Sequence, residues 1–415
     1  LAGSYPENVT VGKAVTLLGA NANVAWADRN RSAESVMCVN NGVAVFTVAA
    51  DHVEINGFEI TSPQANNVLT HTVGTLTAPT EPSHLKYVYN YFHDIGTTRG
   101  SGNVYGIQYL VRSGSPSDIV VADNRFENIG NALALGKSAG AIYFGDSAAT
   151  GHMQDLLIER NVISNVAVTV ATQSSWGIIV GTGWNSTGTV EGLVIRNNEV
   201  SSISGGYASG ISLGGNTPGA VVSNNLVNAI TSTSSPLQAA DVLIETNTGA
   251  GTVNVTGNSL LGALYGVLNK TSLSVTAENN WFGDMTGPTS DLNAGGTGTA
   301  VAGLVDFSPW LGDGTDTLAD VGFQPNAAPV YYTPKYLVFT AEPTNTTLGT
   351  QLEPQPIVTV MNENNETATQ FCGVVSLALG VNPGSGVLAG TTNLVCQSGV
   401  ATFTDLAVTV GGGSG

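Results

Sequence analysis

Four titratable residues in the first third of the chain have types and spacing that suit acid–base chemistry. Glu59, His93 and Glu127 each stand three residues after an asparagine of a repeated pattern, and Asp94 follows His93 directly. Two carboxylates beside a histidine could transfer protons during the cleavage of a glycan. The alternative interpretation is a polar, solvated face on which opposite charges relieve one another.

Three aspartates near residue 316 could hold a metal ion. Asp313, Asp316 and Asp320 lie in a segment rich in Gly and Thr, and their carboxylate oxygens could bind calcium. The alternative is a solvated linker. The five histidines lack the spacing of zinc ligands. We expect no cofactor, and calcium is the one metal for which the sequence offers ligands.

Aromatic residues on an exposed face could stack on sugar rings. Trp184 lies in the sequence GTGWNSTG, within a loop predicted to protrude at 182–190, and is the aromatic residue that we expect to bind a ligand. Tyr109 and Trp176 lie in predicted strands, where alternation assigns both side chains to the core.

Two cysteines and several sequons suggest modifications that belong to an oxidising exterior. Cys372 and Cys396 could form a disulfide that stabilises the fold by roughly 3 kcal/mol, which leaves Cys38 over. In a chain so rich in Asn and Thr, several sequons arise by chance. The candidate glycosylation sites are Asn8, Asn30, Asn185, Asn254, Asn269, Asn345 and Asn365.

The elements that must position these residues come from a short pattern that recurs eight times. Each copy has an apolar residue, two variable residues, Asn, one variable residue and another apolar residue. Stacked directly above one another, the asparagines would form a hydrogen-bonded ladder, and the recurrence predicts a parallel β-helix. The copies are Val53/Asn56/Phe58, Tyr87/Asn90/Phe92, Val121/Asn124/Phe126, Ile158/Asn161/Ile163, Ile195/Asn198/Val200, Val222/Asn225/Val227, Val255/Asn258/Leu260 and Ala277/Asn280/Phe282.

Composition and charge agree with an all-β protein. The 415 residues include 52 glycines and only 10% charged residues, which suits β-branched strands joined by tight turns. The net charge of −18, with 12 Lys and Arg, argues against nucleic acid or an anionic membrane surface as a partner. No apolar run approaches the ~18 residues that span a bilayer. Scarce lysine fits an extracellular or cell-surface location.

The chain divides into three parts. We predict a parallel β-helix over residues 1–311, of which 280–311 form an aromatic C-terminal cap. A linker follows at 312–336. Short alternating strands then predict a β-sandwich over 337–415 whose last strand is missing.

The eight copies, together with ENNWFGDMTGP and VDFSPWL, resemble the right-handed parallel β-helix repeat superfamily, the pectate-lyase-like group. This resemblance covers residues 1 to about 311. Residues 336–415 resemble the bacterial Ig-like repeats of large cell-surface proteins, in which one more strand normally follows. The resemblance implies a right-handed β-helix with an Ig-like domain but no specific chemistry, because this fold carries lyases, hydrolases, epimerases and adhesins alike.

These observations favour a non-enzymatic extracellular protein, a structural or adhesive scaffold or filament subunit with a face that could bind glycans. Its expected partners are neighbouring copies of itself, other surface proteins and glycans, with assembly by strand donation between subunits. The alternative is a carbohydrate-active enzyme, a polysaccharide lyase or epimerase, that works at the face of Glu59, His93, Asp94 and Glu127. A net charge of −18 would repel an acidic polysaccharide unless calcium bridged it.

Overall fold

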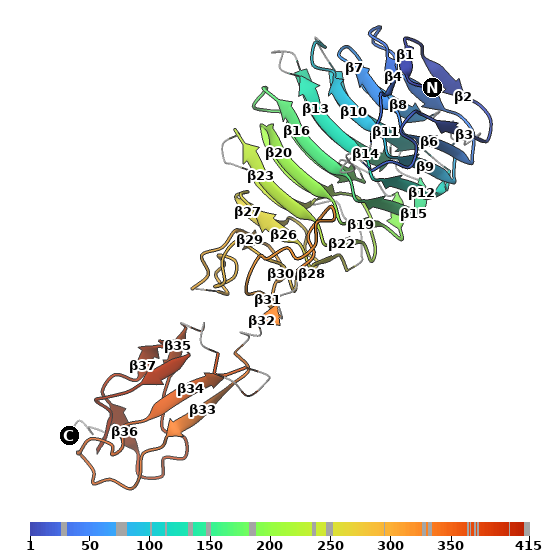
Figure 1. The fold of residues 1–415 in the computed structure, drawn as a ribbon. Coiled ribbons are helices and arrows are strands. Elements are labelled where there is room, and N and C mark those ends of the chain that lie inside the picture. The colour runs from blue at the N-terminus through green and yellow to red at the C-terminus, as the bar shows by residue number, and fades with distance from the viewer. Residues whose placement is uncertain are drawn as a thin grey trace.

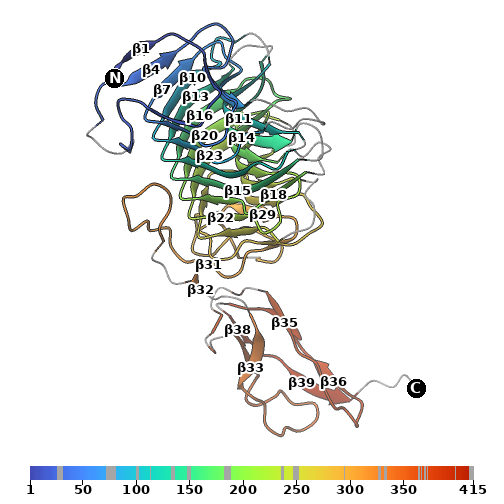
Figure 2. The same ribbon diagram turned by 90° about the vertical axis from the view of Figure 1, so that its right-hand side faces the viewer.

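A computed structural model of the protein shows an elongated all-β molecule (Figures 1 and 2). The structure describes residues 1–25, 31–71, 81–99, 102–112, 114–131, 136–146, 151–181, 188–234, 238–245, 252–293, 295–325, 329–330, 334–362, 365, 367–368, 371, 373–397 and 399–410. Within these ranges there is no helix, and none of the described segments could therefore cross a membrane as one.

Three parallel sheets wrap residues 3–306 into a β-helix, and the chain visits them in the order A, B, C in each turn. Sheet A contains β1 (Gly3–Tyr5), β4 (Ser35–Cys38), β7 (Glu59–Ser62), β10 (Tyr91–Ile95), β13 (Arg125–Asn131), β16 (Val162–Val168), β20 (Glu199–Gly205), β23 (Leu226–Ser232) and β26 (Ser259–Leu261). Sheet B contains β2 (Val9–Val11), β5 (Phe46–Val48), β8 (Asn67–His71), β11 (Gly102–Val111), β14 (Gly136–Asp146), β17 (Ser174–Val180), β21 (Tyr207–Leu213), β24 (Ala239–Ile244), β27 (Tyr265–Asn269) and β29 (Ala300–Ala302).

Sheet C contains β3 (Val15–Leu18), β6 (Val53–Asn56), β9 (Leu85–Val88), β12 (Ser117–Ala122), β15 (His152–Glu159), β19 (Val194–Arg196), β22 (Val221–Ser223), β25 (Asn254–Thr256), β28 (Val275–Thr276) and β30 (Val305–Asp306), with β18 (Thr189–Glu191) paired to β15. Every pair in the three sheets is parallel, with register shifts only in the β7–β10, β11–β14 and β27–β29 pairs. Residues paired in register stack at the usual strand spacing of about 4.8 Å. The all-β, parallel β-helix fold expected from the sequence is confirmed.

Each turn bends through residues in the left-handed backbone region. Their φ angles lie between 49° and 58°, a region that Asn and Asp tolerate better than most residues. The bends form columns before sheet C, between sheets C and A, and within sheet A. The non-glycine members are His52, His84, Asp118 and Asp155 in the first column, Tyr89, Asp123, Arg160, Asn197, Asn224 and Asn279 in the second, and Asp94, Asn128, Asn165, Ser202 and Ala229 in the third.

The asparagine ladder is present between sheets C and A, and all its members are buried. The backbone N–H and the Nδ2 of each asparagine donate to Oδ1 of the next at 2.9–3.1 Å. Each Nδ2 also donates to backbone carbonyl groups of the preceding turn. The ladder consists of Asn90, Asn124, Asn161, Asn198, Asn225, Asn258 and Asn280.

The first copy of the sequence pattern is out of register with this ladder. Phe58, and not Asn56, occupies the ladder position, because its N–H donates to Oδ1 of Asn90 at 3.0 Å. The side chain of Asn56 instead bonds to Asn23 at 2.9 Å. An offset of two residues preserves the alternation of a strand, so the sequence pattern could not reveal the slip. The ladder therefore has seven members and not eight.

The inside of the β-helix is a continuous apolar core. In sheet A, one inward column runs through aromatic and then aliphatic side chains that are fully buried, and the rings of Phe92 and Phe126 stack at 4.6 Å. The segments 284–293, 295–299 and 307–311 lie at the C-terminal end, where Trp310 is 4% exposed and its Nε1 donates to the carbonyl oxygen of Met285 at 3.1 Å. Covering this end protects the open strand edges of the last turn.

Residues 312–325, which we call the strap, fold back against the β-helix. Phe323 is only 1% exposed, and its N–H donates to the carbonyl oxygen of Asn224 at 2.8 Å while Asn224 Nδ2 donates back at 3.2 Å. Beyond the strap, β32 (Pro329–Val330) pairs antiparallel with β31 (Trp310–Leu311). The strap and β32 lie within the predicted linker at 312–336.

Residues 336–410 form antiparallel sheets around a second, smaller core. The strands are β33 (Tyr336–Ala341), β34 (Ile357–Met361), β35 (Val374–Ser376), β36 (Gly386–Ala389), β37 (Asn393–Val395), β38 (Val400–Thr402) and β39 (Ala407–Val410). They pair as β33-β34-β38, β35-β37 and β36-β39. The core of this C-terminal unit is built around Val358, Val360, Phe403 and Leu406.

Candidate functional site

The structure brings the four predicted acid–base residues together on the outer face of sheet A. His93 lies between two carboxylates, with Nε2 at 3.0 Å from Glu59 Oε1 and Nδ1 at 2.8 Å from Asp94 Oδ2. Glu127 belongs to the adjoining turn, where its Oε2 accepts from Tyr91 Oη at 3.0 Å and pairs with Arg125 at 3.0 Å.

The register within this cluster differs from the one the pattern predicts. His93 is opposite Glu127, as expected, but Glu59 is opposite Tyr91 and not His93. The two-residue offset at Asn56 causes this shift. Glu59 nevertheless reaches His93 along a diagonal, because long side chains on neighbouring strands can meet across one position.

Each polar group in the cluster is engaged by a neighbour. Both ring nitrogens of His93 contact carboxylates, and the ring stacks on Tyr91 with centroids 4.3 Å apart. Burial, together with the hydrogen bond to Glu127, raises the pKa of Tyr91 to about 12, so this phenol stays protonated at neutral pH. These groups are engaged with one another, and the arrangement directs none of them to a reacting atom.

A hollow of about 290 Å³ opens on the outer face of sheet B, which the sequence analysis did not identify as a site. It crosses four consecutive turns, at strands β17, β21, β24 and β27. We call it the sheet B groove. Its lining consists of Ser174, Trp176, Tyr207, Ala208, Ser209, Gln238, Ala240, Leu243, Glu245, Leu268 and Lys270.

Stacking of unequal residues creates the groove. Trp176 is in register with Ser209, which in turn is in register with Ala240, so a large ring stands beside two small side chains. Tyr207, at the start of β21, is 39% exposed and forms a second aromatic wall.

Polar groups stand at one end of the groove. Lys270 Nζ is 3.6 Å from Glu245 Oε2 and donates to Gln238 Oε1 at 3.3 Å. A positive charge, a carboxylate and an amide therefore lie beside the aromatic walls. This combination can donate to and accept from hydroxyl groups while the rings contact apolar faces.

The prediction that Trp176 is a core residue is wrong, whereas Tyr109 is fully buried as expected. The reason is a bend in the strand. Gly177 and Ile178 both face inward, since a Cβ on Gly177 would lie 2.4 Å from Val200 Cγ1 and Ile178 is fully buried. Two consecutive inward positions reverse the alternation and turn Trp176 outward. Glycines before a core Ile or Val, at Gly106 and Gly210 as well, were the available signal.

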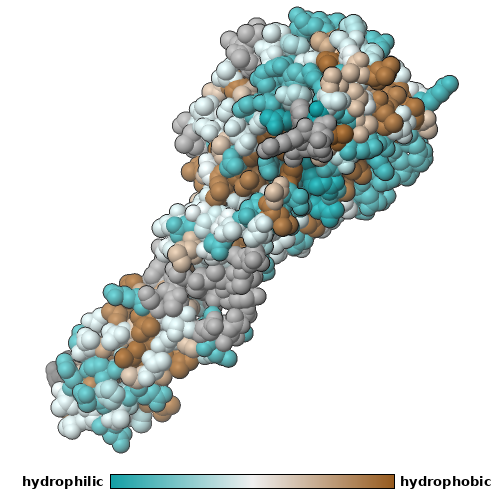
Figure 3. Space-filling view, in the orientation of Figure 1, coloured by the Kyte–Doolittle hydropathy of each residue, from teal (hydrophilic) through white to brown (hydrophobic). Residues whose placement is uncertain are grey.

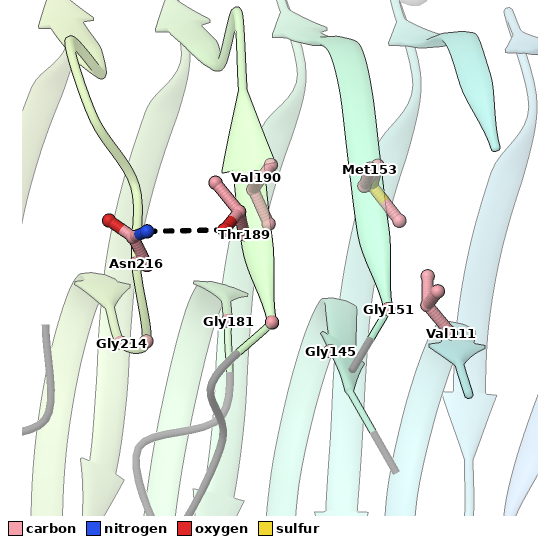
Figure 4. Close-up of a pocket in the computed structure, with 11 residues that line it drawn as sticks. Val111, Gly145, Gly151, Met153, Gly181, Thr189, Val190, Gly214 and Asn216 are labelled. Atoms are coloured by element: carbon pink, nitrogen blue, oxygen red, sulfur yellow. Dashed lines mark hydrogen bonds between the residues drawn. The ribbon is translucent and has the colours of Figure 1, made fainter. Parts of the chain in front are cut away.

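A second hollow lies at the corner between sheets B and C, lined largely by glycines (Figure 4). Asn216 Nδ2 donates to Thr189 Oγ1 across it at 3.1 Å, and Val111 and Met153 border it. Its volume of about 20 Å³ is room for roughly one water molecule, which is too little for a sugar.

Two of the three aspartates predicted to bind calcium accept hydrogen bonds within the strap. Asp313 accepts from the N–H of Thr315 at 2.8 Å, and Asp316 accepts from the N–H of Gln324 at 3.0 Å. The bonds from Thr315 lower the pKa of Asp313 below its ordinary value. Asp320 is exposed. Among the described residues, no three His, Cys, Asp or Glu side chains converge as a metal site, and calcium binding stays a prediction.

Several predicted site residues lie outside the described residues, namely Trp184, Asn30, Asn185 and Cys372. Cys396 is buried, and its pairing with Cys372 stays a prediction. Of the described sequons, Asn8, Asn345 and Asn365 are exposed and Asn254 is partly exposed. Asn269 is 4% exposed, and its amide donates to the carbonyl oxygens of Leu273 and Leu304.

Comparisons of this chain with protein-family models, with curated proteins and with solved structures find no match.

Proposed function

We propose that the protein is an extracellular surface scaffold that binds glycans in the sheet B groove. The observation that carries this proposal is the hollow of about 290 Å³ in which Trp176 and Tyr207 stand beside Gln238, Glu245 and Lys270. Aromatic rings offer flat apolar surfaces to the C–H faces of sugars, and the polar groups suit hydroxyls. A groove across four turns fits an extended chain of sugars better than a single ring.

The location and family are part of the same proposal. A parallel β-helix followed by antiparallel sheets supports membership of the pectate-lyase-like superfamily with an Ig-like C-terminal domain. A net charge of −18 and the scarcity of lysine support a secreted or surface-displayed protein, with other surface proteins among its partners.

The enzymatic alternative at the outer face of sheet A has less support. A catalytic acid or base needs hydrogen-bond reach to the substrate, and His93, Glu59 and Glu127 are engaged with one another or with Tyr91 and Arg125. A polysaccharide lyase would release unsaturated products from polyuronates, with or without calcium, and an epimerase would change the uronate composition of the polymer. Either activity would be lost on Glu127→Gln.

A glycan array followed by calorimetry on the best ligand tests the binding proposal. Trp176→Ala and Tyr207→Ala should each weaken binding about tenfold, because each removes a stacking ring. Trp176→Phe and Tyr207→Phe keep a ring at both positions and should retain most of the affinity. An array without any ligand, or affinity that survives both alanine variants, would reject the groove as the site.

A further inference from the structure

The exposed edge of the C-terminal unit carries a second inference, which does not depend on glycan binding. Strand β33 lies at the edge of its sheet, and among the described residues only β34 pairs with it. Tyr336, Leu337, Val338 and Phe339 are each 36–56% exposed. Hydrophobic residues also reach the surface of this unit in Figure 3.

Leu337 and Phe339 are uncovered on the face that should be buried. They are opposite Val360 and Val358 of β34, which are 1% and 2% exposed and belong to the core. The core face of the sheet therefore continues into β33 without a covering layer. An edge strand with unpaired N–H and C=O groups and apolar side chains is a template for another strand.

The charges that flank β33 indicate which strand fits. Lys335 stands just before it and Glu342 just after it, both exposed, and the strand itself has no charged residue. Neither Lys335 nor Glu342 forms an ion pair with a described residue. A bulge shifts the register between Phe339 and Ala341, which brings Glu342 onto the same face as Lys335.

We infer that β33 pairs antiparallel with β33 of a second copy of this chain, about a two-fold axis at Val338. This pairing places Leu337 of one copy opposite Phe339 of the other on the core face. With the bulge included, Lys335 and Glu342 lie equally far from Val338, so each lysine meets a glutamate of the other copy. The symmetry makes the same contact twice and joins the two three-stranded sheets into one. In this pairing the two copies share a sheet edge, whereas the sequence predicts that one subunit donates a strand to another.

Sedimentation of the full chain over a concentration series tests the inference. We expect a monomer–dimer equilibrium at about 0.15 M salt, where a Debye length of about 8 Å screens the long-range repulsion between two copies of net charge −18 but leaves ion pairs in direct contact. Lys335→Glu should raise the dissociation constant about tenfold, because it sets like charges against one another at both ends. Combining Lys335→Glu with Glu342→Lys should restore dimerisation, since the exchange recreates both pairs.

A second variant separates the edge from general surface charge. Leu337→Lys places a charge within the paired strand and should abolish the dimer, whereas Val381→Lys, at a fully exposed position elsewhere on the unit, should leave it unchanged. A chain that stays monomeric throughout would overturn the inference. So would a dimer that ignores both Lys335→Glu and Leu337→Lys, or protection from hydrogen exchange, in a monomer, of the β33 amides that do not bond to β34.

Discussion

One buried side chain contradicts the apolar character of the β-helix interior. Asp241 in β24 is fully buried, and neither carboxylate oxygen has a hydrogen-bond partner among the described residues. It occupies a column that otherwise holds small or apolar residues, with Gly210 and Gly266 on the adjoining turns and Ala141 further along. Burial raises the pKa of Asp241 well above its ordinary value, because the charged form cannot be solvated there.

We predict that Asp241→Ala stabilises the protein at neutral and alkaline pH. The folded pKa is raised, so the carboxyl contributes its full stability below the unfolded pKa and loses it as pH rises through the folded pKa. Each pH unit over which only the unfolded state is ionised costs about 1.4 kcal/mol. Urea unfolding from pH 4 to pH 9 should show that the advantage of the variant over the parent is smallest near pH 4 and grows by about 1.4 kcal/mol per pH unit until the pH reaches the folded pKa of Asp241.

His71 offers an internal reference for this measurement, because its effect has the opposite sign. Burial lowers its pKa to about 3, while Nδ1 bonds to the carbonyl oxygen of Gln108 and Nε2 to Tyr87 Oη. The stability that neutral His71 contributes to the folded protein is therefore lost as pH falls below about 6.5, the pKa of the unfolded state. Asp241→Ala should keep this acid limb unchanged. A stability gain that is independent of pH would show that the protonation of Asp241 does not change on unfolding, and would contradict a raised pKa in the folded state.

At the scale of elements, each asparagine of the ladder links neighbouring turns through several hydrogen bonds at once. In the middle of the ladder, Oδ1 of Asn161 accepts two bonds from Asn124, and its Nδ2 donates to Asn198 and to two carbonyl groups. Every one of these atoms is buried, so none can turn to water when its partner is removed.

We predict that Asn161→Ala destabilises the β-helix by about 3 kcal/mol or more. The substitution leaves the N–H of Asn124 and one hydrogen of its Nδ2 without an acceptor, and it removes one bond from each of two backbone carbonyl groups. A stranded buried donor costs about 1–3 kcal/mol. Asn228→Ala is the matched control, because Asn228 is partly exposed in sheet A and its side chain forms no hydrogen bond with a described residue. This substitution should change stability by less than about 0.5 kcal/mol. Equal losses in chemical unfolding of both variants would refute a special role for the ladder.

Repetition made the fold predictable from sequence, and local bends limited what else could be predicted. The asparagine ladder and the clustering of His93 with Glu59 follow from periodic residues, whereas the third strand of each turn was not predicted. The slip at Asn56 was invisible because two residues are one full period of a strand. Trp176 was misplaced because Gly177 interrupts the alternation, and the groove was missed with it. Its polar residues, Gln238 and Lys270, lie outside the columns that the asparagine pattern defines.

At the scale of the whole molecule, two cores share no described residue. One runs from Val11 to Trp310 inside the β-helix, and the other spans Leu352 to Leu406 in the C-terminal unit. The strap belongs with the first, because Phe323 is buried against Asn224. Segments with separate cores unfold as separate cooperative units.

We predict two transitions in calorimetry, each sensitive to one phenylalanine. Phe323→Ala should lower the midpoint temperature of the β-helix transition, because it removes the buried ring that holds the strap against the β-helix. Phe403→Ala, the same change in the second core, should lower only the transition of the C-terminal unit, since Phe403 is 2% exposed among its core residues. Each substitution should reduce the free energy of unfolding of its own unit by on the order of 3–5 kcal/mol. If Phe323→Ala moved both transitions together, the strap would couple the two units, and the β-helix and the C-terminal sheets would form one cooperative body.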